Sequence, residues 1–307
     1  MDLRRLRYLI AVADEGHMTR AAEGLGIQQP PLTRQIQNLE AELGVRLLHR
    51  HARGVTLTEA GQAVVADARL ILSAADRLPQ TAQRASRGEM GRLAVGYTSS
   101  AAFHPYVPRR LRAYGRDWPG VRLELEEDST TELVAALRSG RLDVAFIRSM
   151  DHDPTGLRVD PLFDEPMMAV LPLGHPRAVG SDGAIALAGL APETFVFYRR
   201  PAGQGLYDAI ISACHLAGFS PRIGQEAPRL PSTLSLVAAG LGVSIVPASM
   251  QRMNVEGVAY LRLTDAPALV APLLLATRQG DRSPVIDRFR REALAAAAAD
   301  SVWPEGR

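Results

Sequence analysis

The sequence has 307 residues and a mass of 33.1 kDa, a length that predicts two or so domains, each with a sizeable core. Hydrophobic residues make up 47% and charged residues 22%, which excludes wholesale disorder and collagen-like repeats. The formal net charge of +2, from 35 basic and 33 acidic residues, is too small to indicate a nucleic-acid partner by itself. The single cysteine, Cys214, excludes an intrachain disulfide.

Two segments bear on localisation. The longest apolar run, 268–276, is interrupted by Pro272 and is far shorter than the ~20 residues that a membrane-spanning helix needs. The basic N-terminal segment has a short apolar stretch that ends at Asp14 and Glu15 and not at a small-residue cleavage site. We therefore expect a cytoplasmic protein with no membrane partner.

The first 60 residues predict short, closely spaced helices. Apolar residues recur at helical spacing over 3–14, which indicates an amphipathic helix that ends near Gly16. Thr19 is expected to cap a second, short helix that Gly26 ends. A third helix follows after a tight glycine turn, and this arrangement is typical of a helix-turn-helix.

The third helix is expected to begin at Pro30 and Pro31 and to end at Gly44. At 100° per residue its apolar side chains form one stripe, made of Leu32, Ile36, Leu39 and Leu43. The opposite stripe consists of Pro30, Thr33, Arg34, Gln37 and Asn38. Arg34 can donate two hydrogen bonds to guanine, Gln37 can pair with adenine and the Thr33 methyl can contact thymine. Solvation alone also produces a polar outer face, so this pattern does not by itself establish nucleic-acid binding.

A basic turn over 49–57 lies between two short extended segments and predicts a wing. Its arginines, Arg50 and Arg53, would contact phosphates or enter a minor groove.

The residues from Thr19 to Leu48 resemble the LysR-type transcriptional regulators through the pattern Thr-Arg-Ala-Ala-x-x-Leu-x-Ile-x-Gln-Pro-Pro-Leu-Thr-Arg-Gln-Ile-x-x-Leu-Glu-x-x-Leu-Gly-Val-x-Leu-Leu. The similarity continues through Arg50, Leu57-Thr58 and Ala60-Gly61. Gln28 stands where the family usually has serine, which is a better helix cap, and Leu48 stands where it usually has phenylalanine. The candidate contacts with double-stranded promoter DNA are Thr19, Gln29, Pro30, Pro31, Thr33, Arg34, Gln37, Asn38, Arg50 and Arg53.

Thr58 can cap a long helix. Apolar residues recur along it at three- and four-residue steps, namely Val64, Val65, Ala68, Ile71, Leu72, Ala75 and Leu78. The family resemblance implies that this is a linker and dimerisation helix, whereas a helix folded onto its own domain is the alternative. Pro79 predicts a kink or an early end, because it removes a hydrogen bond and clashes one turn back.

From residue 91 onward the pattern alternates between strand and helix. Strands are expected at 93–97, 121–126, 144–147, 195–198 and 243–247, and helices at 106–116, 132–139, 206–217 and 232–239. Two further segments, 165–171 and 269–276, would cross between two α/β lobes. Such lobes look like the periplasmic-binding-protein fold that the family uses to bind effectors.

The expected fold class is therefore α/β with an all-α N-terminal part. It comprises a winged helix-turn-helix at 1–58, a linker or dimerisation helix at 59–90 and an effector-binding domain at 91–307. The two lobes of the last are expected at 91–162 plus 268–307 and at 163–267.

Polar residues follow three predicted strands, at 97–100, at 128–131 and at Arg148. Hydroxyls together with one guanidinium favour a small carboxylate effector. Two alternatives remain, since Ser129 begins a capping-box pattern and Arg148 could pair with a nearby carboxylate. The segment is similar to the LysR subgroup that controls aromatic and chloroaromatic degradation and senses muconate or benzoate-like acids. That resemblance implies the candidate effector contacts Ser99, Ser100, Thr130, Arg148, Phe197 and Pro247. It also implies that the second-lobe segment 197–203 faces the cleft, with Pro247 on a neighbouring edge.

No catalytic constellation is evident, and we expect neither an enzyme nor a metal or other cofactor. His104, His175 and His215 lack metal-ligand spacing with a cysteine, and no Gly-x-Ser-x-Gly motif occurs. The resemblance implies a homodimer or homotetramer that binds promoter DNA and contacts RNA polymerase, as an activator. The alternatives are a small-molecule-binding protein without a transcriptional role and an enzyme with an appended DNA-binding module.

Overall fold

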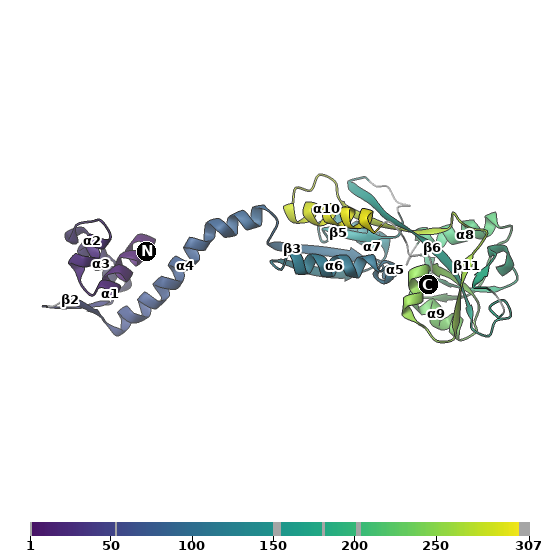
Figure 1. Ribbon diagram of the computed structural model, residues 1–307, viewed down its shortest axis with the longest axis horizontal. Helices are drawn as coiled ribbons and strands as arrows, with labels where there is room; N and C mark the ends of the chain where they lie inside the picture. The colour runs from purple at the N-terminus through teal and green to yellow at the C-terminus, as the bar shows by residue number, and fades with distance from the viewer. Residues whose placement is uncertain (1, 53, 150–154, 180–181, 201–203, 301–307) are drawn as a thin grey trace. The chain divides into compact units, whose positions relative to one another are not determined.

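The structure is a computed structural model, and it describes residues 2–52, 54–149, 155–179, 182–200 and 204–300. The chain divides into two compact units, 1–84 and 85–307, which are described separately below (Figure 1). Within the described ranges, no helix is long and apolar enough to cross a membrane.

The first unit begins with the three expected helices, α1 (Leu3–Glu15), α2 (Met18–Gly24) and α3 (Gln29–Leu43). Gly16 ends α1 and Gly44 ends α3, each in the left-handed conformation that glycine adopts without strain. The predicted cap of α2 is wrong. His17 precedes that helix, and its Nδ1 accepts a hydrogen bond from the backbone nitrogen of Thr19 at 3.3 Å. A ring nitrogen thus takes the place of the expected hydroxyl.

The wing is an antiparallel hairpin of β1 (Leu48–His51) and β2 (Gly54–Leu57). The Glu40 carboxylate on α3 accepts hydrogen bonds from the backbone nitrogens of Leu47 and Leu48 at 2.8 and 3.2 Å, which ties the hairpin to α3. Gly54 has a φ of 143°, and a Cβ there would lie 2.3 Å from the carbonyl oxygen of Gly16. The position therefore requires glycine.

The long helix α4 (Glu59–Ser86) has the expected cap, because the Thr58 hydroxyl accepts a hydrogen bond from the backbone nitrogen of Gly61 at 2.9 Å. The expected early end at Pro79 is wrong, since the helix continues to Ser86. One missing intrahelical hydrogen bond does not end a helix whose flanking turns keep theirs. The kink stays a prediction.

The predicted apolar stripe of α4 splits into two parts. Val65 and Ala68 are buried against α1–α3, so this part packs within its own unit. Further along, the predicted Ile71 and Leu78 are exposed, Leu78 by 65%, and the neighbouring Leu70, which was not in the predicted stripe, is 70% exposed. The second part is an apolar face without a partner in the described chain.

The first lobe of the second unit is built on parallel strands β3 (Gly91–Tyr97), β4 (Val121–Glu127) and β5 (Val144–Ile147). Antiparallel strands β12 (Val270–Arg278) and β6 (Leu157–Pro172) complete it in the order β4-β3-β5-β12-β6. Side chains alternate across this sheet: Leu93 and Val95 pack against α6 (Tyr106–Asp117) and α10 (Pro284–Ala299). Ala94 faces α7 (Thr130–Arg138) on the other side.

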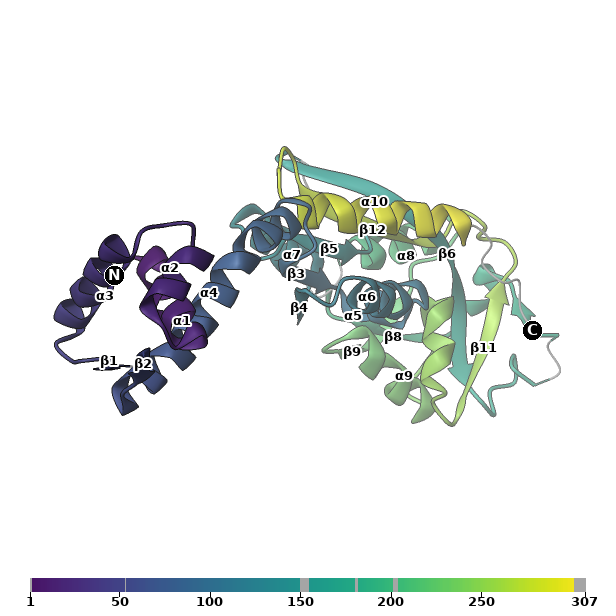
Figure 2. The same cartoon turned by 60° about the vertical axis from the view of Figure 1, so that its left-hand side comes forward.

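The second lobe uses the other half of β6, which pairs with β10 (Ser244–Pro247) and β11 (Val258–Leu263) (Figure 2). Short β7 (Ala184–Ile185) extends β11, and parallel β8 (Thr194–Tyr198) and β9 (Arg222–Ala227) form a small sheet. The covering helices are η1 (Leu187–Leu190), α8 (Gln204–Leu216), α9 (Leu230–Ala238) and η3 (Ala248–Met253).

Two strands cross between the lobes, as expected. In β6, residues 157–166 pair with β12, whereas 167–172 pair with β10 and β11. In β12, Ala271 packs in the core of the second lobe, whereas Leu273 packs in the first. The short helix α5 (Ser99–Phe103) and strands β9 and β11 were not expected from the sequence.

Gly61 provides a test of how α4 packs on the wing. A Cβ at Gly61 would lie 2.0 Å from the carbonyl oxygen of Leu47, so Gly61→Ala must push α4 away from that turn. We expect a loss of about 1–3 kcal/mol in the free energy of unfolding, measured by urea denaturation. Gly24→Ala on α2 is the matched control, because open space surrounds that position and alanine is favoured in a helix. Equal stability of the two variants would contradict the close approach.

Candidate functional site

The third helix separates into two faces, as predicted except at its end. Leu32, Ile36 and Leu39 are completely buried, whereas Leu43, the last residue of α3, is 38% exposed and does not continue the buried stripe. The opposite face is exposed and consists of Gln29, Pro30, Pro31, Arg34, Gln37 and Asn38, with Thr33 half-buried. Thr19 on α2 and Arg50 on β1 are also exposed, whereas Arg53 lies outside the described residues. Gln28 precedes α3 without a side-chain cap, as the replacement of serine predicts.

Positive charge in the first unit is distributed unevenly. Arginines on other helices form ion pairs: Arg5 with Glu42 at 2.8 Å, Arg7 with Asp76 at 3.6 Å, Arg20 with Glu15 at 3.7 Å and Arg69 with Asp14 at 2.5 Å. In the described part of this unit, the side chains of Arg34, Arg46 and Arg50 form no hydrogen bond or ion pair. Uncompensated positive charge thus lies on α3 and the wing, where it can meet an anion.

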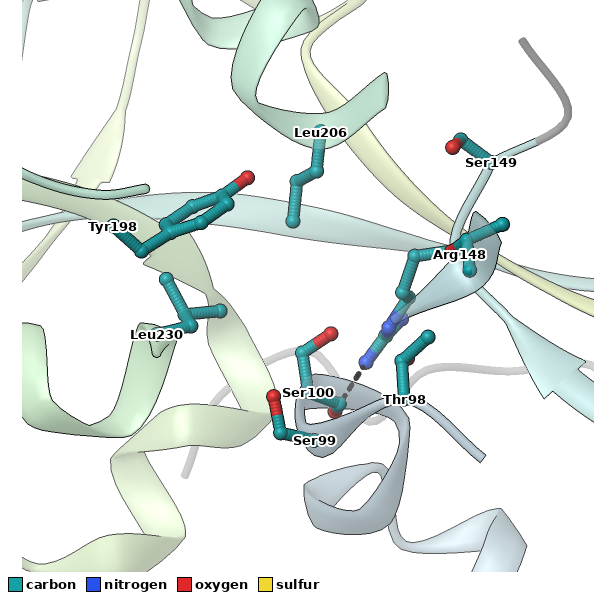
Figure 3. A pocket seen from close by; sticks show the side chains of 9 residues that line it. Thr98, Ser99, Ser100, Arg148, Ser149, Tyr198, Leu206 and Leu230 are labelled. Carbon is teal, nitrogen blue, oxygen red and sulfur yellow. Dashed lines mark hydrogen bonds between the residues drawn. The ribbon is translucent and has the colours of Figure 1, made fainter. Parts of the chain in front are cut away.

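A narrow cleft lies between the two lobes of the second unit; about 20 Å³ of it can hold the centre of a water-sized molecule, and its empty space with the adjoining open solvent is about 370 Å³. Figure 3 shows the side chains that the structure brings together there. The lining residues are Thr98, Ser99, Ser100, Thr130, Arg148, Ser149, Tyr198, Leu206 and Leu230. Four predicted effector contacts, Ser99, Ser100, Thr130 and Arg148, are therefore neighbours.

The first lobe supplies the polar wall of the cleft. The Thr98 Oγ1 is buried and has no hydrogen-bond partner among the described residues. Ser129 is a helix cap, as one of the two predicted interpretations had it, because its hydroxyl accepts a hydrogen bond from the backbone nitrogen of Glu132 at 3.3 Å. The neighbouring Thr130 opens α7 and lines the cleft.

Arg148 both lines the cleft and pairs with a carboxylate. The residue is 3% exposed, and its Nη2 lies 2.7 Å from Oε2 of the completely buried Glu165. Its guanidinium also donates to the backbone oxygens of Ser100 at 2.9 Å and Ala271 at 3.2 Å (Figure 3 shows the first). Burial lowers the pKa of Arg148 and the Glu165 carboxylate opposes that shift. The Arg148 Nε has no partner in the described structure.

Glu165 contacts both lobes. Its Oε2 pairs with Arg148 at the end of β5, and its Oε1 accepts a hydrogen bond of 2.5 Å from the backbone nitrogen of Ser249 in η3. Since β5 belongs to the first lobe and η3 to the second, this carboxylate joins the walls behind the cleft.

The second lobe supplies the apolar wall, made of Leu206, Leu230 and the ring of Tyr198. Burial raises the pKa of Tyr198 well above its ordinary value, so its hydroxyl stays protonated.

The predicted contact of Phe197 is not found in the lining of the cleft, because alternation along β8 places its ring in the lobe's core against Tyr207. Pro247 is also absent from the lining, since it is buried at the end of β10 opposite Met167. The remaining residues of the predicted segment, 201–203, lie outside the described residues.

A second hollow adjoins the cleft at Ser99. It is lined by Ser99, Glu127, Asp128, Ser129, Pro228 and Arg229. Arg229 Nη1 lies 2.5 Å from Glu127 Oε1, an ion pair between the second lobe and the first. Two carboxylates and one guanidinium therefore line this hollow, which we call the mouth hollow.

The histidines do not gather at the cleft. Burial and the nearby Arg148 lower the pKa of His104 to about 3, so this side chain stays neutral at physiological pH. His175 pairs with Glu193 at 3.2 Å, and His215 is exposed on α8. In the ranges that the structure describes, no group of three or more His, Cys, Asp or Glu could hold a metal ion.

Several residues of this site were not predicted from the sequence, of which Glu165 matters most. Glu165 follows Asp164 and directly precedes the apolar run 166–172 in a predicted crossing segment, so an acid at the start of this run was an available signal. Tyr198 lies in the segment 197–203 that was expected to face the cleft, and it lines the cleft.

Comparisons with known proteins cover both units. The family described as "Bacterial regulatory helix-turn-helix protein, lysR family" matches residues 3–62, and "LysR substrate binding domain" matches residues 86–298. The chain is 40% identical to the uncharacterized HTH-type transcriptional regulator YnfL of Escherichia coli strain K12, over 94% of this chain and 97% of the relative. It is 37% identical to the HTH-type transcriptional regulator BudR of Raoultella terrigena, over 94% and 99%. It is also similar to the crystal structure of full-length CbnR complexed with the target DNA, with a TM-score of 0.82, 32% identity and coverage of 97% and 100%.

The buried pair behind the cleft is testable by a double-mutant cycle. Glu165→Gln leaves the Arg148 charge buried without its counter-ion, and we expect a loss of roughly 3–5 kcal/mol in unfolding free energy. Arg148→Met in the Glu165→Gln background removes that charge, so the double variant should lose less than the two single variants added together. Urea denaturation of all four proteins measures the coupling. Additive losses would contradict the pair.

Proposed function

Because the chain belongs to the LysR family of DNA-binding transcriptional regulators, we propose that it controls a promoter in response to a small carboxylate bound in the inter-lobe cleft. The observation that carries this proposal is the pair of buried polar atoms without partners in the cleft lining, Thr98 Oγ1 and Arg148 Nε. A buried donor without a partner costs free energy, which a ligand oxygen would recover. The hydroxyls of Ser99, Ser100 and Thr130 line the same cleft and can donate to the same group.

The first unit is proposed to place the outer face of α3 in a major groove of promoter DNA. Arg34, Gln37 and Thr33 contact base edges, whereas the wing arginines Arg50 and Arg53 contact phosphates. The remaining proposed contacts are Thr19 on α2, Gln29, Pro30 and Pro31 at the start of α3, and Asn38 further along α3. Support comes from the exposure of this face and from the unpaired arginines upon it. In this scheme 1–58 binds DNA, 59–90 links and dimerises, and 91–307 binds the effector.

Two copies are proposed to associate through α4. Leu70 and Leu78 are eight residues apart and largely exposed, which is an apolar face that a second helix would cover. Such a homodimer places two α3 helices on successive half-sites, and pairing of dimers gives a homotetramer. RNA polymerase is the proposed further partner at the promoter.

The carboxylate is proposed to act by binding one arrangement of the assembly more tightly than another. The polar wall and the apolar wall come from different lobes. An occupant that contacts both walls therefore stabilises the spacing of the lobes at which both sets of contacts form. The altered assembly then bends the promoter differently. Aromatic acids and muconates are the candidates that the subgroup resemblance implies.

Replacement of Arg34 tests the proposed recognition helix. Arg34→Ala should weaken binding to duplexes that the wild type enriches from a random pool by roughly 1–3 kcal/mol, and should relax base preference, because a bidentate guanine contact is lost. Fluorescence anisotropy at two salt concentrations measures this. Arg7→Ala on α1 removes the same charge from an ion-paired position and should change affinity little. Equal affinities of Arg34→Ala and wild type would show that α3 does not bind the duplex.

Replacement of Ser100 tests the proposed effector wall. Ser100→Ala removes one hydroxyl from the cleft and should weaken carboxylate binding by about 1.5–3 kcal/mol, the range for a hydrogen bond to a charged group. Calorimetric titration measures the loss, and DNA affinity without effector should not change. Ser220→Ala is the matched control, since Ser220 is exposed and lies outside the lining. Equal carboxylate affinities of the two variants would refute the wall.

A further inference from the structure

We propose that the cleft selects an effector with a single carboxylate and an uncharged apolar body, and that it discriminates against dicarboxylates. Of the two candidate classes named above, this favours aromatic acids with one carboxylate over muconates, which carry two. This inference rests on the proposed function, because it concerns the ligand of the same cleft. It follows from where the described charges and polar atoms lie around that cleft.

The side-chain donors that line the cleft gather on one lobe. Thr98, Ser99, Ser100, Thr130, Arg148 and Ser149 all belong to the first lobe, and Thr98 Oγ1 and Arg148 Nε are buried without a partner in the described structure. One carboxylate, with two oxygens and about four lone-pair sites, can accept hydrogen bonds from several of these donors. Among the described lining residues, the opposite wall offers a single side-chain donor, the Tyr198 hydroxyl, to a group at the other end of a ligand.

The guanidinium in the lining supplies little net attraction for a second anion. Arg148 faces Glu165 at 2.7 Å, and both side chains are buried. Their opposite charges cancel at a distance, and two of the Arg148 donor directions already go to the backbone oxygens of Ser100 and Ala271. A first carboxylate can still use the Nε hydrogen directly. A second carboxylate, further away, faces the Arg148–Glu165 pair, which has no net charge.

The opposite wall is apolar and disfavours a charged group. Leu206 and Leu230 present alkyl groups, and the Tyr198 hydroxyl is the one side-chain donor among the described residues of this wall. Moving an ionised carboxylate out of water against alkyl groups is costly unless hydrogen bonds replace the lost hydration. An apolar ligand body gains free energy at the same place, because its surface leaves water.

The mouth hollow adds repulsion. Glu127 and Asp128 contribute two negative charges to the adjoining hollow, and the single positive charge of Arg229 is paired with Glu127. Asp128 accepts a hydrogen bond from the backbone nitrogen of Ser129 at 2.7 Å, which fixes its carboxylate beside the cleft. A ligand carboxylate that points from the cleft past Ser99 into this hollow therefore meets one net negative charge from the residues that line it. Selectivity arises from this repulsion as well as from the attraction at the polar wall.

The test uses ligand pairs that differ only in a methyl and a carboxylate. The pairs are sorbate with trans,trans-muconate, p-toluate with terephthalate, and butyrate with succinate. Calorimetric titration of the full-length protein at neutral pH should give, for every pair in which either ligand binds, at least a tenfold lower dissociation constant for the monocarboxylate. A dicarboxylate that binds as tightly as its monocarboxylate partner, or more tightly, would overturn the inference and leave the carboxylate effector standing. No binding by any of the six acids would overturn the carboxylate effector itself.

The mouth hollow is tested by Asp128→Asn, which removes one charge and keeps an oxygen that can accept from Ser129. We expect the affinity for the best-bound dicarboxylate to rise about three- to tenfold, with the affinity for its monocarboxylate partner unchanged. Asp182→Asn is the matched control, because Asp182 is exposed and lies outside both linings. An unchanged ratio of the two affinities in Asp128→Asn would overturn the role of the charge in the mouth hollow.

Discussion

A completely buried carboxylate must be neutralised and hydrogen-bonded, and Glu165 meets this requirement with groups from both lobes. Arg148 provides the counter-charge from the end of β5, and the backbone nitrogen of Ser249 provides a hydrogen bond from η3. Because removal of either contact leaves charge or polarity buried, the pair fixes the back of the cleft. The front of the cleft has no such constraint within the described residues apart from the exposed Glu127–Arg229 pair.

This constraint shapes what the cleft can bind. The arginine that sequence reasoning assigned to the effector already has a partner, so its contribution to a ligand is one directed hydrogen bond and little net charge. The ligand is then recognised mainly by hydroxyl groups of the first lobe and by apolar contacts with the second lobe. A ligand that needs both walls is sensitive to the spacing of the lobes, which is the property that a regulator has to transmit to its DNA-binding part.

Local sequence signals predicted much of the fold and part of the site. Helical spacing, proline at the start of α3 and glycine at its end located the recognition helix, because these signals act within a few residues. Ser99, Ser100, Thr130 and Arg148 follow strands or open helices, and parallel strands bring such positions to one edge. Glu165 and Leu230 lacked this guidance, since their place at the cleft depends on how two distant lobes pack. Phe197 and Pro247 lie outside the lining for the same reason. The early end at Pro79 does not occur, because one lost hydrogen bond does not decide the length of a helix.

The most direct test of the account is whether an occupant of the cleft changes the promoter. Energy transfer between dyes at the two ends of an enriched duplex reports its bend while the protein is bound. The account predicts that the best-bound monocarboxylate shifts this transfer with the wild-type protein, and that Ser100→Ala moves the shift to higher ligand concentration. A carboxylate that binds the protein–duplex complex in the cleft and leaves the transfer unchanged would contradict the coupling between cleft and DNA.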